Sequence, residues 1–421
     1  MTANSENPAS STAPSALALF RALRHRNYRL FFAGQLVSLM GTWMQSVAQS
    51  WLVYAMTHSP LLLGLTSFCA QVPLFFIAPF AGAISDRLDR RRLLIVTQGL
   101  AMVQAVILAW LTLTHTVSVW EIMVLACSLG LINSFDVPTR QAFTIEMVGR
   151  EDLRYAISLN SVMFNLARIV GPGAAGLLVA TAGEGVCFSL NAISYAAVLF
   201  SLFMMNTVAR HGSPAREHPL RALQAAAIYV WATKAIRRPL MLLAVSSCFG
   251  ASYLALMPAF ARDVLHQDSE GLGLLMAAVG AGALCGAYAL SRLHDRHLLL
   301  APVISAAVFG TSLVLFSQSR TLPLSMVLLL PTAFGLMLLG GSCNSIIQTL
   351  VDDRMRGRVV AFYSMAFIGM MPWGSLLLGW LGGLIGVSGA VALGGALVIA
   401  SAAAAYLETR GAAVLGQATG D

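Results

Sequence analysis

Residues Gly82-Ala-Ile-Ser-Asp86-Arg87-Leu-Asp89-Arg90-Arg91-Arg92 comprise the end of a long apolar run, 61–85, and a short, strongly charged loop, 86–92, that precedes a second apolar run, 93–114. Each run is long enough to cross the hydrocarbon core of a bilayer as a helix, which takes about 20 residues. A charged loop between two such runs is typical of a helical membrane protein. The rest of the chain repeats this alternation.

The composition of the whole chain agrees with lipid as its solvent. Of its 421 residues, 57% are hydrophobic and 10% are charged, and the mean hydropathy is +0.75, whereas soluble domains carry about 25% charged residues. Open strands cannot satisfy their backbone groups in lipid, so we expect an all-α protein. Twelve apolar runs suit transmembrane helices: 28–56, 61–85, 93–114, 119–143, 154–181, 186–206, 239–261, 272–291, 298–317, 322–350, 359–384 and 386–408.

The twelve expected spans divide into two related halves. Residues Ser161, Phe164, Gly171, Gly176 and Leu178 recur as Ser364, Phe367, Gly374, Gly379 and Leu381, with a constant offset of 203 positions. Two pseudo-symmetric six-helix bundles place a binding site between them, near the midplane. The expected segments are a tail at 1–27, a first bundle at 28–206, a linker at 207–238, a second bundle at 239–408 and a tail at 409–421.

The distribution of positive charge predicts the orientation. The formal charge of +8 would suit a nucleic-acid partner, but 22 of the 26 Lys and Arg residues fall on one side of the expected topology and only two on the other. Such an excess marks the cytoplasmic side. We therefore expect both termini in the cytoplasm and the bilayer, not nucleic acid, as the partner. The linker reads as an amphipathic surface helix at 220–236, with Val230 and Trp231 on its apolar face.

The loop quoted first resembles the signature between helices 2 and 3 of the major facilitator superfamily, G-x-x-x-D-R-x-G-R-R, with Asp89 where Gly is usual. The eleventh helix begins on the same side, and the positive end of its dipole attracts an anion. This predicts a conformational latch between the halves that favours the outward-open state. The alternative is that the arginines only fix topology. The predicted latch residues are Gly82, Asp86, Arg87, Arg90, Arg91, Gly357 and Arg358.

Other stretches resemble one branch of that superfamily, the bacterial transmembrane secretion effectors, which include enterobactin exporters. They include Arg26-Asn-Tyr-Arg29, Phe135-Asp136-Val-Pro138-Thr-Arg140-Gln141 and Ala167-Arg168-Ile-Val-Gly171-Pro172. The resemblance covers most of residues 20–205 and thins to scattered matches in the second half. It implies export but specifies no substrate.

Charged residues within spans are candidates for substrate binding or ion coupling. Asp136 and Arg140 share one face of helix 4, Arg168 lies near the middle of helix 5, and Glu146 lies at the cytoplasmic mouth. In one interpretation Asp136 or Glu146 exchanges a proton while Arg168 holds an anionic substrate group. In the other, Asp136 forms a permanent ion pair with Arg140 or Arg168.

Two further sets of residues are candidates on weaker grounds. Gln45 and Gln49 on helix 1 either line the cavity or bond to neighbouring helices. Glycine and proline within a span bend a helix or admit close packing. The predicted helix-bending residues are Pro138, Gly171, Pro172 and Gly176.

These features together predict a secondary active transporter in a bacterial inner membrane, most simply a monomer. It would export a small, partly apolar molecule, such as a siderophore, a secondary metabolite or a drug, in exchange for protons. No catalytic constellation or ATP-binding P-loop occurs, and the six cysteines stand singly in apolar runs. We therefore expect no enzyme activity, metal or cofactor, and the proton gradient as the energy source. The alternatives are an importer or uniporter, or a non-transporting sensor or accessory subunit.

Overall fold

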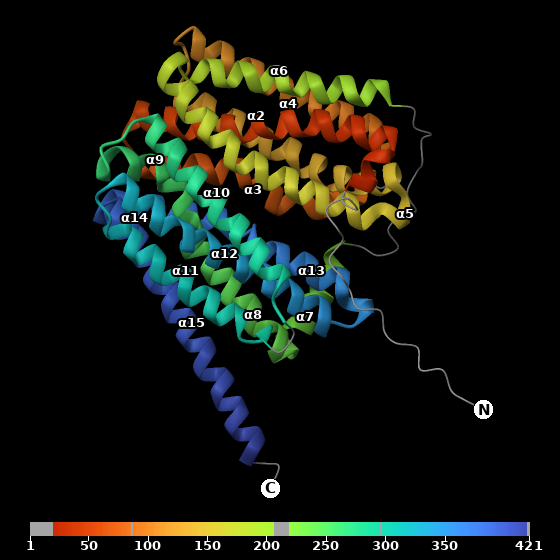
Figure 1. The fold of residues 1–421 in the computed structure, drawn as a ribbon, viewed down its shortest axis with the longest axis vertical. Helices are drawn as coiled ribbons and strands as arrows, with labels where there is room; N and C mark the ends of the chain where they lie inside the picture. The colour runs from red at the N-terminus through yellow and green to blue at the C-terminus, as the bar shows by residue number, and fades with distance from the viewer. Residues whose placement is uncertain (1–19, 86, 206–218, 295–296, 419–421) are drawn as a thin grey trace, which may run out of the picture.

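The computed structural model describes residues 20–85, 87–205, 219–294 and 297–418, and within these ranges it contains helices and no strand. Within the described ranges, ten helices are long and apolar enough to cross a membrane. One of the ten, α5, holds two spans, and α2 supplies the remaining one, since its polar residues lower its hydropathy. The fold is therefore the predicted one, twelve spans in two six-helix bundles (Figure 1).

The first bundle, or N-half, begins with a short 3-10 turn, η1 (Phe20–Arg24). Its spans are α2 (Arg26–Thr57), α3 (Pro60–Ser85), α4 (Arg90–Leu113), α5 (Val119–Ala182) and α6 (Glu184–Met204).

The second bundle, or C-half, follows the linker helix α7 (Pro219–Ala232). Its spans are α8 (Lys234–Val245) with η2 (Ser246–Gly250), η3 (Ala251–Leu256), α9 (Met257–Ala259) and η4 (Phe260–Val264); α10 (Ser269–Ser291); α11 (Ala301–Gln318); α12 (Leu322–Leu350); α13 (Asp353–Phe367) with α14 (Met371–Ile385); and α15 (Val387–Ala418).

Helix α5 is a single element, whereas the sequence predicted two spans with a loop between them. The helical backbone breaks only at Gly149, where φ is +72° and ψ is 177°. That conformation suits glycine, because a Cβ is disfavoured at positive φ. A side chain would find open space there, so the backbone angle and not packing requires the glycine.

Two spans of the C-half are interrupted, which the sequence analysis did not predict. The seventh passes from α-helix through π, 3-10 and π turns between Lys234 and Val264. Pro258 lies in this irregular stretch and lacks a backbone donor. The eleventh is divided between α13 and α14, and Pro372 stands at the start of α14. Interrupted helices inside a membrane are tolerated where they are buried in protein or line a cavity.

The predicted repeat appears in the packing of the two halves. Gly176 on α5 lies against Gly273 on α10, and a Cβ at Gly176 would stand 3.0 Å from the Cα of Gly273. At the equivalent place, a Cβ at Gly379 on α14 would stand 3.1 Å from the Cα of Gly64 on α3. Two positions 203 apart thus admit the same close approach between halves.

The two ends of the molecule differ in how the halves meet. We call the end at the α2–α3 turn the sealed end, and the end where α6 leaves the N-half the linker end. Three hydrogen bonds join the halves among the described residues, and all lie towards the sealed end: Tyr54 to Asp263, Ser67 to Ser375, and Ser269 to the Gly176 carbonyl. In Figure 1, α9 and α14 lie near the N-half at this end, while α7 and α13 lie towards the linker end.

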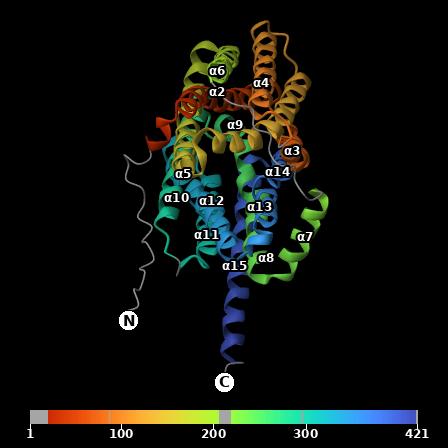
Figure 2. The same ribbon diagram turned by 90° about the vertical axis from the view of Figure 1, so that its right-hand side faces the viewer.

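The peripheral segments depart from expectation in detail. The amphipathic helix α7 ends at Ala232, and its buried residues include Ala226 and Val230, whereas Trp231 is 58% exposed. The seventh span begins at Lys234, before the predicted boundary at 239. Helix α15 continues to Ala418 instead of ending at 408, and it projects beyond the other helices (Figures 1 and 2). The expected N-terminal tail and the first part of the linker lie mostly outside the described residues.

Candidate functional site

A cavity of about 400 Å³ lies between the two halves. Its walls come from α2, α3 and α5 of the N-half and from η3, α9, α10 and α14 of the C-half. Both interrupted spans therefore contribute to it. Among the described residues that line the cavity none is charged; its polar lining consists of Thr42, Gln45, Ser46, Gln49, Ser50, Thr66, Ser67, Gln71, Asn133, Ser252 and Ser375.

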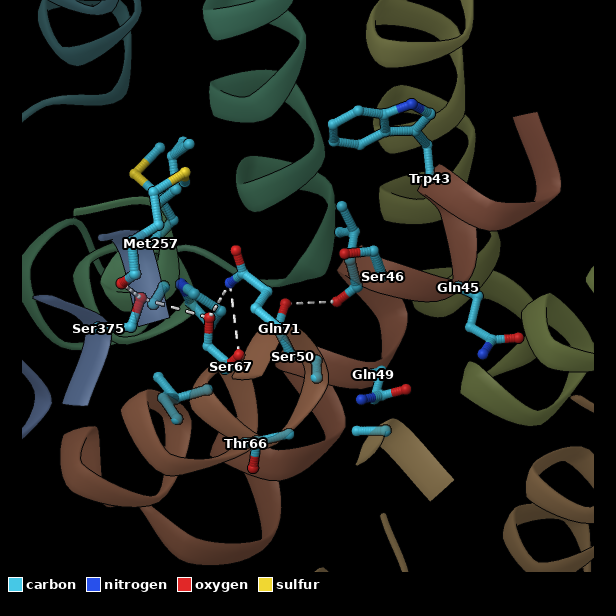
Figure 3. A pocket seen from close by; sticks show the side chains of 18 of the residues that line it. Trp43, Gln45, Ser46, Gln49, Ser50, Thr66, Ser67, Gln71, Met257 and Ser375 are labelled. Carbon is cyan, nitrogen blue, oxygen red and sulfur yellow. Dashed lines mark hydrogen bonds between the residues drawn. The ribbon is translucent and has the colours of Figure 1, made fainter. Parts of the chain in front are cut away.

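A chain of side-chain hydrogen bonds crosses from one half to the other at the cavity wall (Figure 3). Gln71 Nε2 donates to Ser67 Oγ at 3.0 Å, and Ser67 Oγ donates to Ser375 Oγ at 3.4 Å. Ser375 in turn donates to the carbonyl of Met371 at 2.9 Å. The polar groups of this wall are thus mostly occupied by one another.

Two amides in the cavity have unused hydrogen-bonding capacity. Gln49 on α2 and Asn133 on α5 line the cavity, and neither has a hydrogen-bond partner among the described residues. An amide offers both donors and acceptors. Gln49 and Asn133 are therefore the groups best suited to bind a molecule that enters.

Gln45 was predicted with Gln49 but has a different environment. It is 1% exposed, donates to Gln104 Oε1 at 3.2 Å, and accepts from Asn191 Nδ2 at 2.7 Å. These partners lie on α4 and α6, and Figure 3 shows the Gln45 side chain apart from the group around Ser67. Both glutamines line the cavity, but the Gln45 amide is occupied by bonds to neighbouring helices, whereas the Gln49 amide is not.

Asp136 is paired within its own half. Its carboxylate lies 3.2 Å from Arg140, one helical turn along α5, and accepts hydrogen bonds from Thr97 at 3.0 Å and Gln98 at 2.7 Å. Asp136 is 2% exposed and does not line the cavity. With three partners, the carboxylate is compensated where it stands. A role for Asp136 and Arg140 in coupling stays a prediction.

Arg168 lies between the halves without an acidic partner among the described residues. It donates to Asn165 Oδ1 at 3.2 Å, while its Nε is buried without a hydrogen bond. Tyr253 of the C-half lies in its neighbourhood, and the Tyr253 hydroxyl is also buried without a hydrogen bond. The expected alternative of an Arg168–Asp136 pair is wrong in this conformation, since Asp136 bonds to α4 and Arg140. Arg168 does not line the cavity, and its role in substrate binding stays a prediction.

Two arginines of the predicted latch, Arg90 and Arg91, have contacts within the N-half. Arg90 forms an ion pair with Glu146, and Arg91 donates to the carbonyls of Leu202 and Phe203 at the end of α6. Such contacts satisfy free carbonyls at a helix C-terminus. Asp89, which stands where the family signature has Gly, caps α4 by accepting from the Arg92 backbone at 3.1 Å.

The cross-half part of the predicted latch lies largely outside the described residues. Asp86 lies outside the described residues, and so do the contacts around Gly82. Arg87 is exposed, and a side chain at Gly357 would meet open space. Arg358 contacts Met355 within α13. The latch therefore stays a prediction.

The predicted helix-bending residues act at least partly through packing. A Cβ at Gly171 would stand 2.7 Å from the Trp43 Cβ on α2, and Gly176 packs on α10 as described. Pro138 and Pro172 lie inside α5, whose only non-helical backbone angles are at Gly149. Bending at these prolines stays a prediction.

The sequence analysis missed Asn133, Ser67, Gln71 and Ser375. Each is a polar residue inside an apolar run, which is itself a signal, because polar groups in spans face the bundle interior or a cavity. Asn133 also precedes Asp136 by three residues and was overlooked beside that charge.

Known proteins resemble this chain in sequence along most of its length. The sequence pattern that defines the transmembrane secretion effectors, a family of the major facilitator superfamily, matches residues 16–412. The staphyloferrin A transporter of Staphylococcus aureus is 26% identical over 85% of this chain and 90% of its own length. The enterobactin exporter EntS of Shigella boydii is 26% identical over 86% of each chain. The multidrug efflux pump Tap of Mycolicibacterium fortuitum is 27% identical over 82% of this chain and 87% of its own.

Solved structures share the fold at low sequence identity. The peptide-transporter-family protein PepTSo superposes with a TM-score of 0.73 at 12% identity, covering 92% of this chain and 98% of its own. A bacterial homologue of the human lysosomal transporter Spinster, solved in an inward-facing and unoccupied conformation, has a TM-score of 0.67 at 12% identity and covers 94% and 96%. The fold, the cavity between the halves and the match over residues 16–412 lead to one assignment: this multi-pass membrane protein belongs to the transmembrane secretion effector family of major facilitator transporters.

Proposed function

We propose that this protein exports a small, uncharged, hydrogen-bonding molecule across a bacterial inner membrane by alternating access. One observation carries the proposal: the cavity between the halves is lined by hydroxyl and amide groups without a charged side chain, and the amides of Gln49 and Asn133 are free to bind. A charged substrate group would lose water there without gaining a counter-ion, which is costly. The multidrug efflux and siderophore-exporting relatives support export of small molecules.

The described conformation fits one stage of that cycle. If the linker end is cytoplasmic, as the positive charge predicts, the hydrogen bonds and glycine contacts between the halves close the outer side. A substrate would then enter from the cytoplasm and meet Gln49 and Asn133. Closure of the linker end, assisted by Asp86 and the start of α13, would precede release outside.

The proton gradient remains our proposal for the energy source. Neither Asp136 nor Glu146 lines the cavity. A proton bound to either carboxylate would therefore change contacts between helices and would not contact the substrate directly. Glu146 is the more accessible, with its side chain 19% exposed beside Arg90 near the linker end. Protonation of Glu146 would remove its ion pair with Arg90, which is one of the predicted latch residues.

Transport by the full chain in proteoliposomes tests the substrate class. A fluorescent dye carrying a carboxamide is compared with its carboxylate counterpart, which has nearly the same size. We expect the carboxamide to be transported faster, the Gln49→Leu and Asn133→Leu variants to lose that transport, and a proton ionophore to abolish it. Faster transport of the carboxylate, with loss in Arg168→Gln but not in Gln49→Leu, would contradict the proposal and return Arg168 to the binding site.

A further inference from the structure

A second cavity, of about 450 Å³, opens on the outside of the C-half. It lies between the α7–α8 corner and α15, and is lined by Trp231, Arg237, Arg238, Met241, Leu242, Val245, Ser401, Ala404, Ala405 and Glu408. No part of it belongs to the N-half, so it is separate from the transport cavity. We call it the α8–α15 groove.

The groove is polar at one end and apolar along its length. Arg237 and Arg238 lie near the start of the span that begins at Lys234, and Glu408 lies at the end of the span that begins at Val387. The charged end is therefore at the level where the membrane meets water. From there Met241, Val245 and Ala404 continue along the two helices towards the membrane interior.

The charged end carries a surplus of positive charge. Arg238 Nε lies 3.0 Å from Glu408 Oε2, which compensates one of the two arginines. Arg237 lies with its guanidinium carbon 5.6 Å from the centre of the Trp231 ring and donates to the Trp231 carbonyl at 3.3 Å. It has no acidic partner among the described residues. Its remaining donors suit an anion, and the planar fork of arginine matches a phosphate.

Trp231 completes the site. Tryptophan favours the headgroup level of a membrane, where its ring is in an apolar setting and its N–H can reach polar groups. Its side chain is largely exposed although it lies on an amphipathic helix beside the groove. An exposed Trp, an uncompensated Arg and an adjoining apolar groove together match a phospholipid with an anionic headgroup.

We propose that the α8–α15 groove binds an anionic phospholipid. Its phosphate would contact Arg237 and Arg238 beside Trp231, and one acyl chain would lie along Met241, Val245 and Ala404. The lipid would thus fill the space between the seventh and twelfth spans of the C-half.

Native mass spectrometry of the purified full chain can count retained lipid. The probes are phosphatidylglycerol and phosphatidylcholine with the same acyl chains, and inorganic phosphate as competitor. We expect preferential retention of phosphatidylglycerol, and binding of it about tenfold weaker or more in the double variant Arg237→Gln with Arg238→Gln, since each basic group near a membrane surface changes lipid affinity several-fold. Ala404→Phe, which fills the groove without changing charge, should also reduce retention.

The matched control is Arg292→Gln. Arg292 lies over an aromatic ring, Tyr288, at 5.3 Å just beyond the end of α10, but it lines neither cavity described above. This variant should retain phosphatidylglycerol like the unaltered chain. Equal retention of the two lipids, equal loss in Arg292→Gln, no loss in either groove variant, or displacement of the lipid by inorganic phosphate would each overturn the proposal.

Discussion

The fourth span of the N-half and the tenth span of the C-half occupy equivalent places but have different chemistry. With the offset of 203 residues, Asp136 and Arg140 correspond to Leu339 and Cys343, both fully buried. At this place the N-half is held together by an ion pair with two further hydrogen bonds, whereas the C-half packs apolar groups. The same fold tolerates both solutions, so the charges are not needed to form the bundle. A buried ion pair that the fold does not require has either a role in selecting one packing arrangement or a part in ion coupling.

The largest effect is expected from breaking the pair in the N-half. Asp136→Leu leaves Arg140 without its counter-ion and should lower the free energy of unfolding by about 3–5 kcal/mol. The double variant Asp136→Leu with Arg140→Cys copies the C-half and should recover most of the loss. Thermal unfolding in detergent measures both. If the double variant is as unstable as the single one, the two halves are not equivalent at this place.

A second effect concerns the interrupted span of the C-half. A Cβ at Gly374 would overlap the carbonyl oxygen of Cys248 in η2 and the Oγ of Ser252 in η3, both in the irregular seventh span. Gly374→Ala should therefore destabilise by about 1–3 kcal/mol and reduce transport, because η3 forms part of the cavity wall. The control is Gly383→Ala on the same helix, where a Cβ meets open space and alanine should be neutral or slightly stabilising. Equal stability and equal transport in the two variants would show that the close contact with the seventh span contributes to neither.

The smallest effect is expected outside the spans, where Asp152 follows the break at Gly149. The hydrogen bond from His25, together with the nearby Arg21, holds the pKa of the Asp152 carboxyl below its usual value. A lowered pKa stabilises the fold above the usual pKa of about 4, and this contribution is lost as the pH falls through the lowered value. The melting temperature of Asp152→Asn should lie slightly below that of the unaltered chain at pH 7, and the difference should shrink as the pH falls through the lowered pKa of Asp152. The exposed neighbour Glu151→Gln should show no such trend.

The number of spans, the two halves and the repeat were predictable because lipid imposes length, helicity and charge asymmetry on every span. The irregular seventh and eleventh spans were not, since their hydropathy is like that of any other span. The residues in the sequence that could have indicated the interruptions are Pro258 and Pro372. The prediction of the site relied on charged residues and so emphasised Asp136 and Arg168. Hydrogen-bond partners on neighbouring helices decide which polar side chain remains available to a substrate, and the sequence does not show these partners. Gln45 and Gln49 show this most clearly, because one helix turn separates them and the sequence treats them alike.

The central claim is that a free amide in an uncharged cavity binds substrate, while its neighbour on the same helix holds the N-half together. Gln45→Leu and Gln49→Leu test it in one experiment that measures melting temperature in detergent and transport of the carboxamide dye in proteoliposomes. Gln49→Leu should keep its stability and lose transport. Gln45→Leu should lose stability, by about 1–3 kcal/mol for each group left unbonded, since Gln104 and Asn191 lose a partner. Full transport in a stable Gln49→Leu variant, or unchanged stability in Gln45→Leu, would contradict the account.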